Sequence, residues 1–157
     1  MIDFAPHDHD GCIASALAAA EEGCAARGLR LTDARRRVLE ILLESHRALG
    51  AYDVLDRLRA EGRPAQPPLV YRALDFLVAQ GFVHRIERLN AFVACARPGA
   101  EHAPAFLICR ACEAVAEMPV APEEGRLGSA ARATGFALEA TTLEAEGLCP
   151  NCRGAVA

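Results

Sequence analysis

The chain lacks lysine, so all 17 of its basic residues are arginine. Arginine makes planar contacts with phosphate and guanine, but we attribute the complete absence of lysine to a biased genomic composition. The chain also lacks an apolar run of the roughly 18 residues that span a bilayer. Its acidic N-terminus has neither the basic start nor the apolar core of a secretory signal. We therefore expect a cytoplasmic protein that has no membrane partner.

The overall composition is that of a globular protein, with 52% hydrophobic and 24% charged residues. The length of 157 residues suffices for one domain or two small ones. The net charge of −4 is unevenly distributed. Residues 27–97 hold 13 arginines against eight acidic residues, whereas residues 98–157 hold four arginines against eight glutamates. This distribution predicts a module that meets a polyanion, followed by one that does not.

The first part of the chain has the apolar periodicity of helices and then that of strands. Helical spacing predicts helices over 12–27, 32–45, 51–61 and 67–80. Gly81 is placed to end the last of them, whose predicted core stripe is Val70, Leu74, Leu77 and Val78. Alternation predicts strands over 82–87 and 91–95. Helices followed by such a hairpin form a winged helix-turn-helix pattern, which we place at residues 12–96.

The remainder of the chain predicts a second, smaller domain after a linker at residues 97–100. We expect strands over 105–109 and 115–118, a helix over 123–134 and a strand over 136–144. The predicted fold class is therefore α/β (α+β), with a small α/β domain over 101–157. About 60 residues give a marginal core, so a metal or oligomerisation is expected to stabilise it. Residues 1–11, including His7-Asp8-His9-Asp10, are interpreted as a disordered tail.

Two C-x-x-C pairs are the most specific signal in the sequence. They are Cys109-Arg110-Ala111-Cys112 and Cys149-Pro150-Asn151-Cys152. Each turn of this kind presents two thiolates to one ion, and two turns complete a tetrahedral shell of four sulfurs that suits zinc. Four protein ligands leave no position for water, so the predicted role is structural. The alternative is free thiols or two separate redox pairs.

A second group of potential ligands remains outside these pairs. Its members are His84, Cys95, His102 and Glu117. Each has an ordinary interpretation as a packing or surface residue, and their spacing alone leaves open whether they share an ion. Cys12 and Cys24 fall on the first predicted helix and are interpreted as packing residues or spare thiols.

Several motifs, taken in order, resemble the ferric uptake regulator superfamily and, within it, the zinc uptake regulator branch. The segments are QPPLVYRALDFL at 66–77, QGFVH at 80–84, AYDVL at 51–55 and Arg30-Leu31-Thr32 with Arg35, beside the paired C-x-x-C motifs. The resemblance covers roughly residues 14–153. It implies a homodimer with an N-terminal winged-helix domain that binds double-stranded operator DNA and a C-terminal dimerisation domain that holds a structural zinc.

The resemblance also implies a second, regulatory zinc at the hinge, and thus two zinc ions per chain. In zinc-sensing members its ligands are a wing histidine, a cysteine, a histidine and a glutamate, which match His84, Cys95, His102 and Glu117. Tyr52, Tyr71, Arg72 and Arg35 are the expected DNA contacts. An arginine near the start of the fourth helix can donate two hydrogen bonds to guanine. Arg35 lies at a helix start, where it can contact phosphate.

Two departures from the superfamily pattern bear on the metal and on the DNA. The stretch 102–109 that leads into the first C-x-x-C contains one histidine, His102, where iron and peroxide sensors carry several. Leu69 replaces the usual threonine, and with it a hydroxyl that could contact phosphate. The sequence therefore predicts a zinc-responsive repressor of zinc uptake genes, with an iron or peroxide sensor on the same fold as the alternative. An enzyme is not expected, since no nucleophile–base pair or phosphate loop is evident and no small-molecule substrate is implied.

Overall fold

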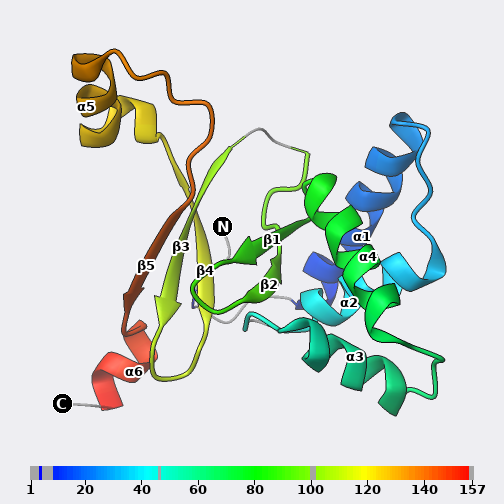
Figure 1. Ribbon diagram of the computed structural model, residues 1–157. Coiled ribbons are helices and arrows are strands. Elements are labelled where there is room, and N and C mark those ends of the chain that lie inside the picture. Colours follow the sequence, from blue (N-terminus) through cyan, green and yellow to red (C-terminus); the bar gives the residue numbers. More distant parts are fainter. Residues whose placement is uncertain (1–3, 5–8, 46, 100–101, 156–157) are drawn as a thin grey trace.

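The computed structural model describes residue 4 and residues 9–45, 47–99 and 102–155. A helical part and a three-stranded sheet lie on opposite sides of a two-stranded hairpin, which we call the wing (Figure 1). The helical part and the wing comprise α1 (His9–Ala26), α2 (Asp33–Leu43), α3 (Ala51–Ala60), α4 (Pro67–Ala79), β1 (Val83–Ile86) and β2 (Ala91–Ala94). The remaining elements are β3 (Ala103–Cys109), β4 (Val115–Val120), the 3-10 helix η1 (Pro122–Glu124), α5 (Arg126–Thr134), β5 (Leu143–Gly147) and α6 (Pro150–Ala155).

Local signals set the ends of the helices in the first part. Thr32 caps α2, because its hydroxyl accepts the N–H of Arg35 at 3.4 Å. Prolines occupy the first turn of α4, where the missing N–H groups cost nothing. After α4 the chain turns at Gly81, whose φ of +77° favours glycine. The fourth helix and the glycine after it are as predicted.

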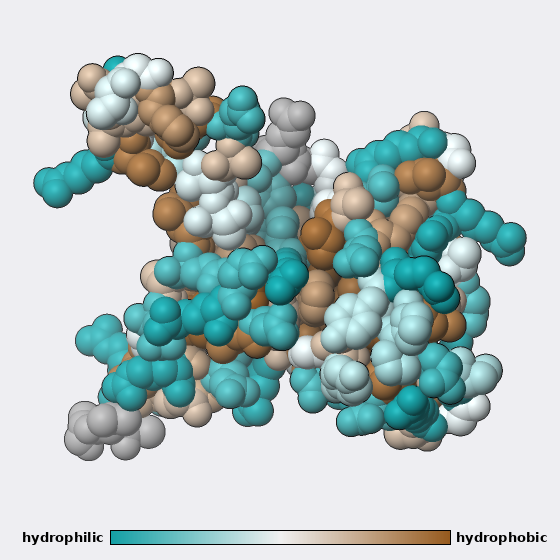
Figure 2. All heavy atoms as spheres, in the orientation of Figure 1, coloured by the Kyte–Doolittle hydropathy of each residue, from teal (hydrophilic) through white to brown (hydrophobic). Residues whose placement is uncertain are grey.

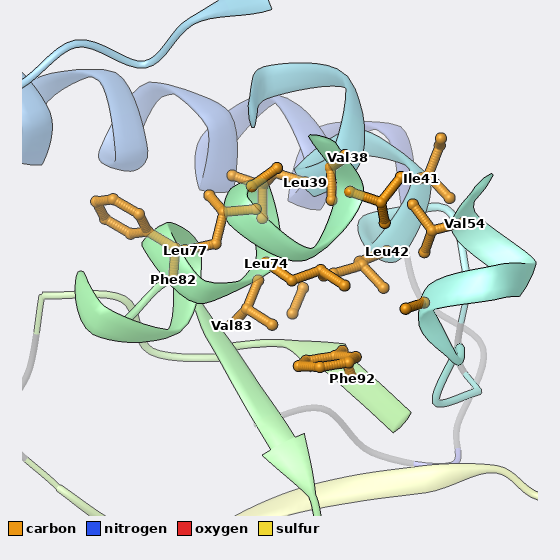
Figure 3. Packing of buried hydrophobic residues seen from close by; sticks show 14 of the residues in the cluster. Val38, Leu39, Ile41, Leu42, Val54, Leu74, Leu77, Phe82, Val83 and Phe92 are labelled. Atoms are coloured by element: carbon orange, nitrogen blue, oxygen red, sulfur yellow. The ribbon is translucent and has the colours of Figure 1, made fainter. Parts of the chain in front are cut away.

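The main core lies between these helices and the wing (Figure 3). Leu39, Leu42 and Val38 of α2 pack with Leu74 and Leu77 of α4, and all five are buried. The core stripe predicted on α4 was correct except at its end. Val78 is 38% exposed, and Ala73 lies in the buried stripe instead. The stripe of α4 therefore follows the 70, 73, 74, 77 spacing of one helical face.

The N-terminal helix starts earlier than expected. α1 begins at His9 rather than at residue 12, so the disordered tail predicted over 1–11 is wrong for residues 9–11. The rest of that tail, including His7 and Asp8, lies outside the described residues apart from Phe4. Ala100 of the predicted linker also lies outside them.

The second part differs from the prediction in three places. The strand expected over 136–144 is wrong, because only residues 143–147 form β5 and residues 136–142 pair with no strand in the described structure. The helix expected over 123–134 is divided into η1 and α5, and α6 was not predicted. β5 runs parallel to β3, so the chain must cross over through η1 and α5 before it can pair.

The wing packs on one face of the sheet, whose strand order is β4-β3-β5. Ile86 of the wing is fully buried against Phe106, Ile108 and Val115. The opposite face carries exposed apolar side chains, including Leu107. Figure 2 shows brown, apolar atoms over α5 and the sheet beside it. No helix in the described ranges is long and apolar enough to cross a membrane.

Candidate metal centres and nucleic-acid interface

Four cysteines converge at the end of the sheet. Cys109 ends β3, Cys112 lies in the following turn, and Cys149 and Cys152 lie at the start of α6. Their four sulfurs all lie within 4.8 Å of one another. The Sγ atoms of Cys112 and Cys149 are 3.8 Å apart, far longer than a disulfide bond. The structure therefore brings together the four thiols that the C-x-x-C spacing predicted.

The protonation of this cluster is uneven. Hydrogen bonds from the backbone N–H groups of Cys149 and Cys112 lower the pKa of Cys109 to about 6. Side-chain hydrogen bonds with Cys149 and Cys112 raise the pKa of Cys152 to about 12. At neutral pH the cluster thus contains both thiolate and thiol, held close together. Such a set suits a soft divalent ion, which displaces the remaining protons and satisfies all four sulfurs.

The second group of predicted ligands also converges, although its members come from four segments. His84 lies on β1, Cys95 directly after β2, His102 directly before β3, and Glu117 on β4. Nε2 of His102 is 2.6 Å from Oε1 of Glu117, and Nε2 of His84 is 3.4 Å from the same oxygen. Sγ of Cys95 is 3.7 Å from Nε2 of His102. All four ligand atoms lie within 4.8 Å of one another.

Burial at this second site favours a bound cation. Glu117 is 3% exposed and is the one buried charged side chain among the described residues. A buried carboxylate is costly unless it is paired. Nε2 of His84 is buried and, apart from its long 3.4 Å contact with Oε1 of Glu117, has no hydrogen-bond partner among the described residues. Both features point to an ion at the centre, and two nitrogens, one sulfur and one oxygen are a donor set that zinc accepts.

The site also contacts the backbone at residues 96 and 97, where the linker begins. The N–H of Ala96 donates to Oε2 of Glu117 at 2.8 Å, and the N–H of Arg97 donates to Sγ of Cys95 at 3.3 Å. Burial raises the pKa of Glu117, but the interactions with His84 and with the Ala96 N–H outweigh it, so the net pKa is lowered. These outer contacts orient two of the candidate ligands. They are backbone donors, which no pattern of side chains could have revealed.

Metal binding at this second site should depend on pH through Cys95. Burial, and next the charge of Glu117, raise the pKa of this thiol to about 12. The thiol is protonated at neutral pH and must release its proton to bind zinc. We expect the apparent zinc affinity to rise about tenfold from pH 7 to pH 8. Competition titration with a chelator measures this slope; Cys95→Ser should flatten it, and a pH-independent affinity in the parent protein would contradict the assignment.

Three of the four predicted DNA contacts have exposed side chains. Tyr52 at the start of α3 is 63% exposed, Tyr71 on α4 is 45% exposed, and Arg72 beside it is exposed. Tyr52 and Tyr71 line a pocket of about 420 Å³ between α3, α4 and the wing, where Arg85 and Asp75 also lie. Tyr71 and Arg72 place an aromatic ring and a guanidinium on the N-terminal half of α4, which suits insertion into a major groove.

The arginine run on α2 is engaged within the protein. The guanidinium of Arg35 lies over the ring of Phe76 at 3.6 Å and donates to the carbonyl oxygen of Arg30. Arg36 and Arg37 form ion pairs with Glu21, Glu40, Glu44 and Glu61. The hydrogen bond to Glu61 contributes most to raising the pKa of Arg37. Arg35 retains further N–H donors for phosphate, whereas Arg36 and Arg37 mainly join α2 to its neighbours.

Comparison with known proteins identifies the family. The model of the ferric uptake regulator family matches residues 26–146. The chain belongs to the ferric uptake regulator family. Within this family it belongs to the zinc uptake regulator branch, because it is 45% identical over 139 residues to the zinc uptake regulation protein of Escherichia coli. That match covers 87% of this chain and 80% of the relative.

Solved structures of this branch resemble the chain in fold and, in the holo form, in how the two parts of the chain are placed relative to each other. A zinc uptake regulator complexed with zinc and DNA has a TM-score of 0.84 at 42% identity, covering 92% of this chain and 97% of that one. The holo form of XcZur has a TM-score of 0.78 at 44% identity, covering 89% and 98%. The apo form of XcZur, at the same identity and covering 91% and 99%, has a TM-score of only 0.54. The relation between the two parts of this chain thus resembles the holo form.

Proposed function

We propose that this chain is a zinc-responsive repressor that binds operator DNA as a homodimer. The observation that carries the proposal is the second site, whose ligands come from both sides of the linker at residues 97–100. His84 and Cys95 belong to the wing and its end, whereas His102 and Glu117 belong to the sheet. The names of the 45% identical relative and of the zinc- and DNA-bound structure support the same function.

The geometry provides a mechanism for the response. A zinc ion at this site would act as a cross-link that holds four side chains in one shell. His84 then fixes β1 against β4, and Cys95 fixes the start of the linker, so the angle between the two parts is set. A dimer reads two half-sites only at one separation of its recognition helices. Ligation therefore favours operator binding, and operator binding must raise the zinc affinity by the same factor.

The remaining assignments follow from this arrangement. We assign residues 12–96 to DNA binding, residues 97–100 to the hinge and residues 101–157 to dimerisation, with exposed Leu107, Leu127 and Phe136 as apolar contact area. The four cysteines hold a structural zinc, which makes two ions per chain. Zinc uptake genes are the proposed targets, and the cytoplasm is the proposed location. No catalytic role is assigned.

A DNA-binding titration in buffered zinc, iron(II) and manganese(II) tests the proposal. Operator affinity should rise steeply with free zinc and respond weakly to the other two metals, because the thiolate of Cys95 favours zinc. A response to iron(II) or manganese(II) at lower concentrations than zinc would instead support the iron- or peroxide-sensing alternative. DNA binding that is independent of any metal would contradict both.

Arg72→Ala tests the proposed recognition surface. Arg72 is exposed on the first half of α4, one residue after Tyr71. If it reads a base edge, its loss should cost about 1–3 kcal/mol of operator affinity and relax preference at one position of each half-site. Quantitative binding to a set of single-base operator variants measures this. Arg126→Ala, an equal change of charge on α5, is the matched control, and a uniform loss across all variants would mark Arg72 as a phosphate contact.

A further inference from the structure

The face of the sheet that receives the wing has a carboxylate at each edge. On β3, Phe106 pairs with Glu117 of β4 on one side and with Glu144 of β5 on the other. Residues directly opposite each other in a sheet share a face, so these three side chains form one row. Neighbouring strands lie about 4.8 Å apart, which places the two carboxylates on the order of 10 Å from each other.

The wing lies across this row from one edge to the other. His84 lies beside Glu117 at the β4 edge, with its ring 5.4 Å from that of Phe106. Ile86 is buried over the central strand. The turn after Ile86 reaches Glu144 at the β5 edge. The candidate metal site therefore holds one end of β1, and a separate contact holds the other end.

In that second contact, a carboxylate accepts two hydrogen bonds from backbone N–H groups. Oε1 of Glu144 accepts the N–H of Glu87 at 2.7 Å, and Oε2 accepts the N–H of Arg88 at 2.9 Å. The last pair of the wing ladder is Ile86 with Ala91, so neither N–H belongs to a ladder pair. Hydrogen bonds to an ionised acceptor are short and roughly twice as strong as neutral ones. Glu144 thus satisfies both donors at once.

A neighbouring ion pair reinforces the contact only slightly. Nε of Arg88 lies 2.9 Å from Oε2 of Glu146, which follows Glu144 on the same face of β5. Both side chains are exposed, and exposed ion pairs contribute little because water and salt screen them. Glu144 is therefore the residue on which the contact depends.

We propose that Glu144 is a positioning residue, which fastens the wing turn to β5 and thereby holds the DNA-binding part in its operator-competent orientation. This inference rests on the proposed function. The contact of Glu144 with the wing turn is called the wing latch below. It involves none of the candidate metal ligands, so it stabilises the packing of the wing on the sheet whether or not zinc is bound. The wing latch thus raises the fraction of molecules in which the four zinc ligands already lie together. Loss of the wing latch should lower that fraction and so weaken zinc binding, although Glu144 is not a ligand.

Glu144→Gln in the full chain tests the wing latch. Glutamine keeps the size of the side chain but replaces one acceptor with an NH₂ group that faces an N–H donor. We expect the zinc affinity of the second site and the operator affinity at limiting zinc each to fall about tenfold. Amide hydrogen exchange at Glu87 and Arg88 should accelerate by a similar factor. Glu144→Ala should do the same, and the zinc content at saturation should stay at the parent value.

Glu139→Gln is the matched control, because Glu139 is an exposed carboxylate on the segment before β5. Unchanged zinc affinity in both Glu144 variants, or unchanged exchange at Glu87 and Arg88, would overturn the wing latch. Both of these measurements are made without DNA. If the parent protein shows no zinc-dependent operator binding, the proposed function fails. Lower zinc affinity and faster amide exchange in the Glu144 variants would still support the wing latch as a contact that holds the wing on the sheet.

Discussion

Replacing Cys112 by serine should remove the structural zinc and unfold the C-terminal part of the chain. The core that joins this part to the wing is small, with Ile86, Phe106, Ile108 and Val115 as its buried members. The four cysteines join the end of β3 to the start of α6. Structural zinc contributes about 10–16 kcal/mol in small domains, more than such a core can replace. We therefore expect loss of the dimer as well.

Analytical ultracentrifugation and zinc content per chain measure this effect. Cys12→Ser is the control, because Cys12 is exposed on α1 and belongs to neither metal cluster. This variant should remain dimeric with two zinc ions per chain. A stable Cys112→Ser dimer that keeps two ions per chain would show that the four-cysteine cluster is not a structural zinc site.

Most of the helical part could be predicted because its signals are local. The cap at Thr32, the prolines at the start of α4 and the positive φ at Gly81 all act within a few residues of their position. The two C-x-x-C pairs are equally local, since each sets the position of two sulfurs within one turn. The predicted winged helix and the convergence of the four cysteines therefore agree with the structure.

The misplaced strand has a different origin. The sequence of residues 136–144 predicts a strand, but a local sequence does not determine whether a partner strand is available. β3 pairs with residues 143–147, and Phe136 remains 66% exposed. The crossover through η1 and α5 determines which residues reach β3, and that is a property of the tertiary structure. The same pairing places Glu144 and Glu146 opposite the wing, which no motif of the sequence indicated.

The second candidate metal site was predictable only in part. Spacing alone could not bring His84, Cys95, His102 and Glu117 together, because they come from four segments that meet only through sheet pairing and the fold of the wing. The family resemblance identified them from their positions in the motif order. The structure brings them within ligand distance and adds the hydrogen bonds from Ala96 and Arg97.

Cys95→Ser should abolish zinc-dependent operator binding while the protein remains folded and dimeric. The thiol lies at the end of the wing, so its loss removes the soft ligand and the bond that fixes the start of the linker. Changing even an outer contact of a metal ligand costs roughly 10–100-fold in affinity, and losing the ligand itself should cost at least as much. The four-cysteine cluster is untouched, so one zinc ion per chain should remain.

Zinc content measured beside operator affinity decides this prediction, with Cys24→Ser as a comparison. Cys24 is also buried but lies in the core of the helical part, so its replacement should lower the melting temperature without changing the response to zinc. Glu117→Ala should also strongly weaken the zinc response, although water can replace one lost oxygen ligand. The reason is that Oε2 of Glu117 also accepts the N–H of Ala96, so the substitution removes a second contact. If Cys95→Ser protein keeps two zinc ions per chain and binds the operator normally, these side chains do not sense zinc and the hinge mechanism is wrong.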